Sequence, residues 1–219
     1  MKQKEFAALY RRYLRDALPG TAMRGTVLHL PPVGDLLTGC HFETSGFAKT
    51  DFVLHAFVDP LYVPFPALKL TYGYRLGWRQ ERWFRLSEES EEEAMGEALR
   101  LIQAQALPLF ERFRTAADFA RHAKELISDR ENPNYVEAVA YSHVLAGDYE
   151  QGRAGVARVL ELKRAEDDLL PFEREMVRRN EQFLLKLRDR PEEAVADLHG
   201  WRRETLRAIG FKDAPSVLP

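Results

Sequence analysis

Apolar residues near the N-terminus recur with the period of a helix. Within residues 4–17, Phe6, Leu9, Tyr10 and Leu14 fall on one face, which is the spacing of an amphipathic helix. A Pro-Gly pair follows and predicts that the helix ends there. The apolar face of this helix must pack on a neighbouring element, and the pattern that comes next is that of a sheet.

Between residues 22 and 86 the alternation of apolar and polar residues has a period of two, which is typical of β-strands. The stretch 52–58 is apolar on both faces, so we expect it to be a central strand. Because the connections are short, an antiparallel meander is favoured over a parallel sheet, which would need crossover helices. The expected strands are 23–30, 40–44, 52–58, 68–76 and 78–86.

A proline-rich connection, PLYVPFP, occupies residues 60–66. Its three prolines remove backbone donors and fix the backbone, so it cannot be a central strand. We expect a stiff loop whose apolar side chains pack against the body of the protein.

After residue 87 the period lengthens to that of helices. Pro108 predicts a kink or an end in the first of them. Three local signals mark helix starts: capping-box spacing in two places and an Asn-Pro pair in the third. These signals are Ser90 with Glu93, Thr115 with Asp118, and Asn132-Pro133.

Two segments in the last third of the chain align at an offset of 42 residues. Each has the pattern of a helix, a short polar turn and a second helix. Gly152 and Gly155 would allow the two helices of the first hairpin to approach closely. The predicted helices are 134–146 with 149–163, and 171–187 with 191–209.

The segment AYSHVLAGDYEQGRAGVARVLEL, from Ala140 to Leu162, resembles the tetratricopeptide repeat. The resemblance implies helical hairpins that stack on one another, because one hairpin cannot cover its own apolar face. The chain departs from the repeat in having Gly152 where alanine is usual and a period longer than 34 residues. Only two copies are present, so we expect hairpins that lean on the sheet domain.

The front half, with its leading amphipathic helix and aromatic-rich meander, is similar to small uncharacterised bacterial α+β families. Some of these families are linked to toxin-immunity loci. The resemblance implies an immunity-type or regulatory role.

These patterns together predict an α+β fold. An N-terminal helix packs on an antiparallel β-meander of four or five strands, and an all-helical part with two stacked helical hairpins follows. We expect a sheet domain over residues 1–88 and a helical domain over 89–219. Residues 1–88 carry 12 Lys and Arg against 8 Asp and Glu, and 14 of the 24 aromatic residues, so the two parts differ in composition as well.

Composition narrows the classes of function. The formal net charge is −2, so only a local patch could bind nucleic acid or an anionic surface. A single cysteine excludes an intramolecular disulfide. No apolar run is long enough to span a membrane, and the charged N-terminus lacks the pattern of a signal peptide. We therefore expect a cytoplasmic protein without membrane partners.

Catalytic and metal-binding patterns are weak. His29, Cys40, His41 and His55 fall in the predicted sheet without the spacing of a metal site, and Cys40 and His41 would face opposite sides of a strand. The chain has neither a G-x-S-x-G elbow nor a P-loop. We expect no catalytic residue, no metal and no cofactor, which argues against an enzyme.

Basic residues interleaved with aromatics form the most informative cluster. Tryptophan and arginine are typical anchors of protein interfaces. We therefore expect a protein-interaction module that occludes its partner. Two alternatives stay open: the same cluster could bind single-stranded nucleic acid, or a pocket under residues 60–66 could serve a small-molecule enzyme. The predicted partner-binding residues are Arg75, Trp78, Arg79, Arg82, Trp83 and Arg85.

Overall fold

The computed structural model describes residues 2–31, 33–46, 50–77, 83–86 and 90–212. The chain forms two compact units. Unit 1 comprises residues 1–59 and 70–114, and unit 2 comprises residues 60–69 and 115–219. This division by contacts is distinct from the change of sequence pattern at residue 88, so the domain boundary expected there stays a prediction.

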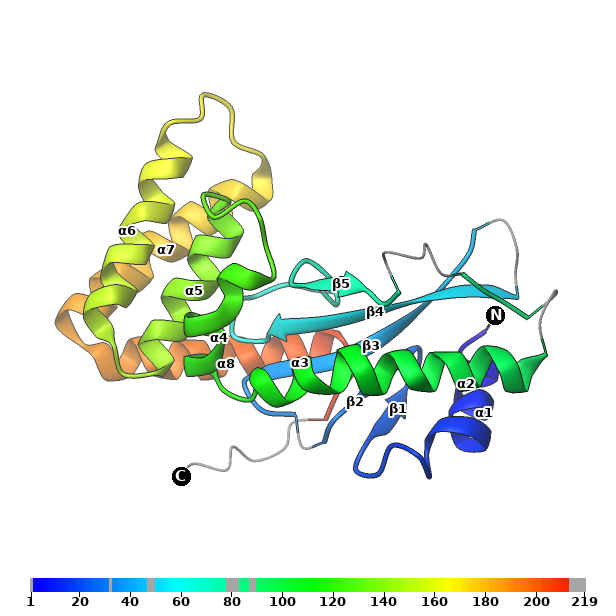
Figure 1. The fold of residues 1–219 in the computed structure, drawn as a ribbon. Coiled ribbons are helices and arrows are strands. Elements are labelled where there is room, and N and C mark those ends of the chain that lie inside the picture. The colour runs from blue at the N-terminus through cyan, green and yellow to red at the C-terminus, as the bar shows by residue number, and fades with distance from the viewer. Residues whose placement is uncertain (1, 32, 47–49, 78–82, 87–89, 213–219) are drawn as a thin grey trace. The chain divides into compact units, whose positions relative to one another are not determined.

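Unit 1 contains a six-stranded antiparallel sheet and the helices packed on it (Figure 1). The strands follow the order β1-β2-β3-β4-β5, and β6 also pairs with β4. The fold class expected from the sequence is confirmed. The elements are α1 (Gln3–Leu9), η1 (Tyr10–Leu14), β1 (Ala22–Arg24), β2 (Val27–His29), β3 (Leu36–Thr44), β4 (Asp51–Pro60), β5 (Gly73–Arg75), β6 (Phe84–Arg85), α2 (Glu91–Leu101), η3 (Ile102–Ala106) and α3 (Leu107–Arg112).

The core of unit 1 is aromatic. Phe6 of α1 lies against Phe42 of β3 and Phe52 of β4, with ring centroids 5.2 and 5.6 Å apart. Phe84 of β6 stacks on Phe52 at 4.8 Å. All four rings are buried, and aromatic pairs at these separations add to the stabilisation from apolar burial. These contacts attach the N-terminal helix and the edge strand β6 to one face of the sheet.

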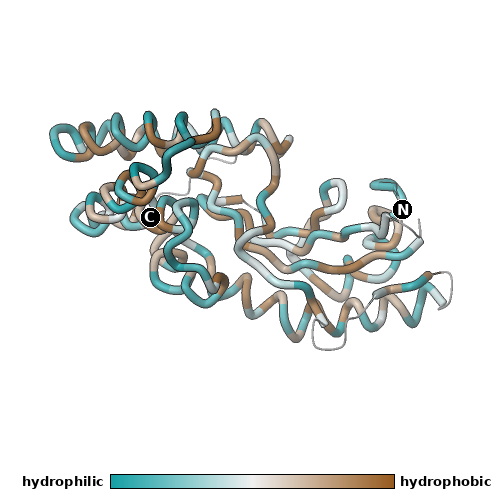
Figure 2. Tube along the Cα trace, turned by 90° about the horizontal axis from the view of Figure 1, so that it is seen from above, coloured by the Kyte–Doolittle hydropathy of each residue, from teal (hydrophilic) through white to brown (hydrophobic). Residues whose placement is uncertain are grey.

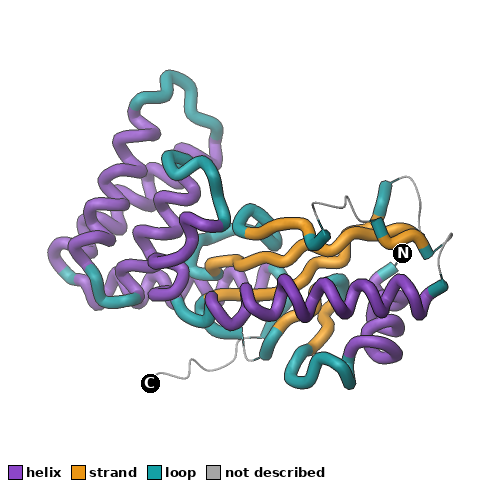
Figure 3. The backbone as a smooth tube through the Cα atoms, viewed as in Figure 1, coloured by secondary structure: helices purple, strands orange, loops and turns teal. Residues whose placement is uncertain are grey.

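A long helical stretch from α2 to α3 runs beside the strands (Figure 3). Polar and apolar positions alternate along it (Figure 2), and its apolar residues Met95, Ala98 and Ile102 are buried. Ser90 and Glu93 form the expected capping box at its start. Pro108 does not end the helix: a π-helical segment, η3, precedes α3. Proline lacks the backbone N–H and crowds the preceding turn, which explains the wider turn at this point.

Two expected strands differ from the prediction. The strand expected over residues 23–30 is a hairpin, β1–β2, because Gly25 adopts a positive φ of 60° and reverses the chain. The strand expected over 68–76 is limited to β5, since residues 60–69 belong to unit 2. In the fifth expected strand, residues 78–82 lie outside the described residues, and β6 is the described part.

Unit 2 is helical and contains both predicted hairpins, α5–α6 and α7–α8. The capping box of Thr115 with Asp118 and the Asn132 cap before Pro133 are confirmed as helix starts. Gly147, with a φ of 83°, ends the first helix of the first hairpin. The elements are α4 (Ala116–His122), η4 (Ala123–Glu125), α5 (Pro133–Leu145), α6 (Tyr149–Arg164), α7 (Pro171–Asp189) and α8 (Pro191–Ala208).

Small residues set the spacing of the first hairpin, as expected. A Cβ added at Gly155 would lie 2.6 Å from the Cβ of Ala140, and one added at Gly152 would lie 2.4 Å from a methyl carbon of Val144. Real side chains do not approach so closely, because packed interiors leave no room to yield. The two glycines therefore allow α6 to approach α5 as closely as it does.

The proline-rich segment 60–69 is part of the core of unit 2. Leu61, Tyr62 and Val63 are buried as expected, whereas Phe65 of the same segment is 45% exposed. The Ser142 hydroxyl of α5 donates to the carbonyl of Ala138 at 2.6 Å. Tyr62 must therefore donate to the Ser142 oxygen, which it contacts. This buried hydrogen bond ties the segment to the first hairpin.

Candidate functional site

Three of the six predicted partner-binding residues lie in the described part of the chain. Arg75 is half-buried on β5, Arg85 is exposed on β6, and Trp83 immediately precedes β6. The other three residues lie outside the described residues: Trp78, Arg79 and Arg82.

The structure brings Arg75 and Trp83 together. The guanidinium carbon of Arg75 lies 4.8 Å from the centroid of the Trp83 ring, which is the geometry of a cation–π contact. Both residues are placed by pairing with β4: Arg75 is opposite His55, and Phe84, the neighbour of Trp83, is opposite Phe52. Arg85 is opposite Asp51, on the same face of the sheet as His55 because alternate residues share a face.

A groove of about 530 Å³ surrounds this contact. Its size is that of a typical small-ligand or side-chain pocket. Gly73 lies against β4, where an added Cβ would be 2.1 Å from the carbonyl oxygen of Ala56, so this strand pairing requires glycine. We call this feature the Arg75–Trp83 groove; it is lined by Glu43, Val53, His55, Gly73, Tyr74, Arg75 and Trp83.

An ion pair contributes to one wall of the groove. His55 Nε2 lies 2.9 Å from Glu43 Oε2, so the carboxylate of β3 orients the imidazole of β4. On β3, burial lowers the pKa of His41, and the nearby Glu43 raises it less than burial lowers it. His41 is therefore neutral at pH 7. The groove thus combines the guanidinium of Arg75 with the carboxylate of Glu43 and the imidazole of His55.

Tyr74 lies at the edge of the groove, but its side chain projects from the opposite face of the sheet to Arg75, because adjacent residues of a strand point to opposite faces. The phenol donates to the carbonyl of Gln105 in η3 at 2.9 Å. Burial raises the pKa of Tyr74, so the phenol stays neutral at physiological pH. Tyr74 is therefore fixed toward η3 and adds no charge to the groove.

Sequence reasoning missed the pairing of Glu43 with His55. The sequence pattern indicates His55 only as a weak candidate metal ligand, and it does not single out Glu43. Their alternation placed each on a strand, but the register between β3 and β4 decides that they meet.

On β3, Cys40 lies opposite Leu28 of β2 and is fully buried, and this burial raises the pKa of its thiol. Cys40 and His41 therefore face opposite sides, as expected.

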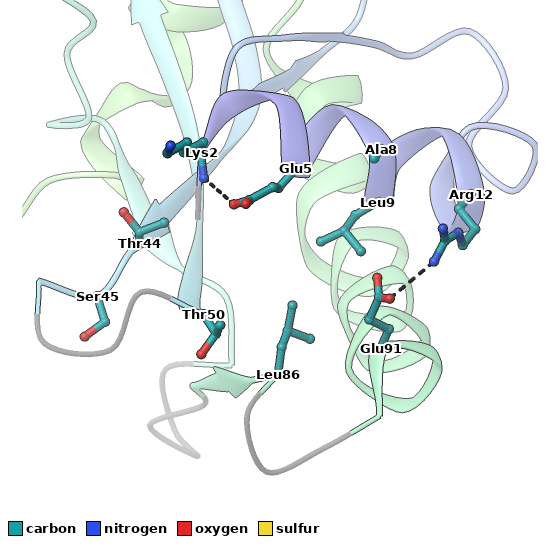
Figure 4. Close-up of a pocket in the computed structure, with 10 residues that line it drawn as sticks. All are labelled: Lys2, Glu5, Ala8, Leu9, Arg12, Thr44, Ser45, Thr50, Leu86 and Glu91. Carbon is teal, nitrogen blue, oxygen red and sulfur yellow. Dashed lines mark hydrogen bonds and ion pairs between the residues drawn. The ribbon is translucent and has the colours of Figure 1, made fainter.

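A second cavity, of about 600 Å³, lies between the N-terminal helix and the ends of the strands (Figure 4). Lys2, Glu5 and Leu9 line one side, and Thr44 and Thr50 line the other. An ion pair of 3.2 Å between Arg12 and Glu91 lies at its edge. Arg12 and Glu91 are both largely exposed, so their ion pair contributes little to the stability of the fold. None of the predicted partner-binding residues lines this cavity.

Unit 2 contains a buried polar cluster that the sequence did not predict. Glu137 of α5 is fully buried, and its Oε1 accepts from Arg179 Nη2 at 2.7 Å and from Asn180 Nδ2 at 2.6 Å. The hydroxyl of Tyr141 donates to Asn180 Oδ1 at 3.0 Å. Arg179 also faces the ring of Trp201, 5.8 Å from its centroid. The cluster joins α5, α7 and α8 and is a structural element, because the groups in contact with one another all belong to the hairpins themselves.

Comparison with known proteins assigns neither a family nor a function to this chain. The chain has no match among known protein families, curated proteins or solved structures. Within the described ranges, no group of three or more His, Cys, Asp or Glu is arranged to hold a metal ion. No helix in the same part of the chain is long and apolar enough to cross a bilayer.

Proposed function

We propose that this protein is an interaction module that binds an acidic surface of a protein partner in the Arg75–Trp83 groove and acts by occluding it. The observation that carries the proposal is the Arg75 guanidinium held against the Trp83 ring at 4.8 Å. Arginine, tryptophan and tyrosine supply most of the energy at protein interfaces. The groove places an arginine and a tryptophan in contact within a single hollow.

The stacking prepares the groove for binding. A free arginine or tryptophan side chain loses rotamer freedom when a partner orders it, at about 0.5–1.5 kcal/mol each. Arg75 is already ordered by β5 and by the Trp83 ring. A partner carboxylate that reaches this guanidinium would gain charge-assisted hydrogen bonds at a reduced entropic cost.

The charge pattern favours a protein over nucleic acid. Glu43 lines the groove, and Asp51 lies on the same face of β4 as His55. Carboxylates beside a binding arginine repel a phosphate chain, which needs a continuous basic track. A protein surface can present an acidic side chain to Arg75 and a basic or neutral one to Glu43.

The helical hairpins support the same class of function. Stacked hairpins that resemble tetratricopeptide repeats offer extended surfaces to partners. The proposed immunity-type or regulatory role rests on this resemblance and on the leading helix with its aromatic meander. In such a role the protein would act by covering the active surface of its partner, without chemistry of its own.

A comparative capture experiment tests the proposal. The full chain, the Arg75→Glu variant and an Arg203→Glu control on the exposed face of α8 are immobilised, and the proteins retained from the native lysate are compared. We expect at least one protein on the wild type and on the control that Arg75→Glu loses. Retention of the same proteins by all three would contradict the proposal.

A second measurement separates a protein partner from nucleic acid. Fluorescence anisotropy with short single-stranded oligonucleotides over a salt series should be flat. Phosphate neutralisation gives a steep salt dependence, so a salt-dependent signal that Arg75→Glu abolishes would assign the groove to nucleic acid instead.

A further inference from the structure

The loop between α6 and α7 exposes two large apolar side chains. It lies at the top of Figure 1 and joins the two hairpins of unit 2. Leu170 is 55% exposed and Phe172 is 61% exposed. Leu170 is the N-cap of α7 and Phe172 lies in its first turn, so both are exposed at the start of the same helix. Apolar side chains grouped on a surface mark interaction sites more often than single ones do.

A network of ion pairs holds this loop in place. Lys163, near the end of α6, is almost completely buried. Its ammonium donates to both carboxylate oxygens of Glu166, at 2.8 and 3.0 Å, and also contacts Glu173 of α7. Burial alone would lower the pKa of Lys163, but the two carboxylates raise it, so the lysine is fully charged. One cation thus ties the two ends of the loop together.

The backbone next to the exposed side chains is fixed as well. The second oxygen of Glu173 accepts from the backbone N–H of Leu170 at 2.8 Å. Arg174 donates to the carbonyl of Leu169 at 2.6 Å. Pro171, the first residue of α7, fixes its own φ. The loop therefore has an ordered backbone while its largest apolar side chains face solvent.

This arrangement is that of a prepared binding element. An exposed leucine or phenylalanine on a loose loop would lose conformational freedom when it binds, whereas the backbone here is already ordered. Ordering an exposed apolar tip gives the isolated protein no burial of apolar surface. A binding role accounts for both the exposure and the ion pairs beneath it.

The charges around the tip indicate the kind of partner. Asp167 and Asp168 precede the two leucines and are exposed, whereas Glu166 is bound by Lys163. The nearby arginines are engaged within the protein, Arg164 with Glu181 and Arg174 with the Leu169 carbonyl. An acidic flank is attracted to basic residues on a protein and is repelled by the anionic surface of a membrane. The complementary surface is an apolar pocket rimmed by lysine or arginine.

We propose that Leu170 and Phe172, the apolar tip of the α6–α7 loop, insert into an apolar pocket with a basic rim on a protein partner. This surface is separate from the Arg75–Trp83 groove and does not depend on the function proposed for that groove.

Site-specific photo-crosslinking in the full chain tests this proposal. A photoreactive phenylalanine analogue replaces Phe172, or, as the control, Leu185, which is 55% exposed in the middle of α7. Cells producing each variant are irradiated, and the crosslinked peptide of any adduct is sequenced. We expect an adduct at Phe172 that maps to apolar residues flanked by lysine or arginine. At Leu185 we expect a yield lower by about tenfold, the ratio that corresponds to losing one modest contact.

Charge reversal of the flank completes the test. Asp167→Lys together with Asp168→Lys should reduce the Phe172 adduct several-fold while circular dichroism and thermal unfolding stay unchanged. Three outcomes would overturn the proposal: no adduct at Phe172, equal adducts at both positions, or an adduct unaffected by charge reversal. Binding to phosphatidylcholine vesicles that Phe172→Ala abolishes would also overturn it, because it would assign the tip to a membrane.

Discussion

The two units place their polar groups in opposite ways. In unit 1 the face of the sheet around Phe42 and Phe52 is aromatic and apolar, and the charged residues line an open groove. In unit 2 a charged pair, Glu137 with Arg179, lies within the helical core. Apolar packing is non-directional and tolerates adjustment, whereas a buried ion pair is favourable in one geometry only. The comparison shows that charged side chains of unit 1 line a groove open to solvent, whereas the Glu137–Arg179 pair of unit 2 joins two helices in the core.

The largest expected effect comes from breaking the buried pair in unit 2. Glu137→Ala would leave Arg179 without its carboxylate and Asn180 Nδ2 with the Met176 carbonyl as its remaining acceptor. Removing one partner of a buried pair costs about 3–5 kcal/mol. In unit 1, Ile102→Val removes one buried methylene from an apolar core and should cost about 0.5–1.5 kcal/mol. Urea unfolding, monitored by hydrogen exchange of each unit separately, measures both losses of stability.

A double variant sharpens this contrast. Replacing Glu137 and Arg179 together by methionine removes both charges, so no unpaired ion remains in the core. Well-packed apolar replacements of buried ion pairs are often neutral or stabilising. We expect Glu137→Met with Arg179→Met to recover most of the stability lost in Glu137→Ala. A double variant that is as unstable as the single one would show that the pair does not act through its charges.

A smaller effect, with opposite signs, is expected from glycine substitutions in the two units. Gly155→Ala places a Cβ 2.6 Å from that of Ala140 and should destabilise the protein by about 1–2 kcal/mol, because overpacking outweighs the gain in helix propensity. Gly96 of α2 has no atom within 4 Å of an added Cβ, so Gly96→Ala should stabilise by about 0.5–1 kcal/mol. Thermal unfolding of both variants gives the signs. Two shifts in the same direction would contradict the close approach of α5 and α6.

The smallest expected effect is a dependence of unit 1 on pH. Burial lowers the pKa of His41 in the folded protein, whereas the pKa of a histidine in the unfolded chain is about 6.5. The unfolded state therefore binds more protons below that pH, and stability falls as the pH drops through about 6.5 toward the folded value. His41→Gln should flatten this slope by about 1 kcal/mol or less. Burial lowers the pKa of His29 as well, so part of the slope should remain.

Equilibrium unfolding between pH 3 and pH 8 checks this prediction. Glu173 in unit 2 provides the comparison, because hydrogen bonds from Lys163 and from the Leu170 backbone lower its pKa. Its contribution is present above the unfolded pKa of about 4.3 and is lost as the pH falls through the folded value. Hydrogen exchange should therefore show unit 1 weakening at a higher pH than the α6–α7 loop. The reverse order would count against the burial of His41.

Local signals in the sequence predicted local structure well. The capping residues Ser90, Thr115 and Asn132 each accept a hydrogen bond from a backbone N–H no more than three residues further along the chain. Their helices begin where expected. The glycine spacing in α6 also predicted a close helix approach. Residues 68–72 were assigned to a strand by their alternation. In the structure the strand is limited to 73–75, with one further hydrogen bond from the Val58 backbone N–H to the Tyr72 carbonyl, and residues 60–69 belong to unit 2 instead.

The candidate site was predicted in part, for a similar reason. The run of arginine and tryptophan residues indicated an interface, but the Arg75–Trp83 contact depends on both strands pairing with β4. The Glu43–His55 pair likewise needs two strands in register. In unit 2, Glu137 stands alone among apolar residues in α5. That single charge was the signal for a buried cluster, but its partners come from helices about 40 residues further along.

The most direct test of the central claim is the affinity for the partner that the wild-type chain retains. Titration calorimetry compares the wild type with Trp83→Ala and with Arg203→Ala on α8. Loss of an interface anchor costs about 2 kcal/mol or more, which corresponds to a Kd about 30-fold weaker. We predict this loss for Trp83→Ala and an unchanged Kd for Arg203→Ala. Equal Kd values for all three proteins, each with its fold intact by circular dichroism, would contradict the assignment of binding to the Arg75–Trp83 groove.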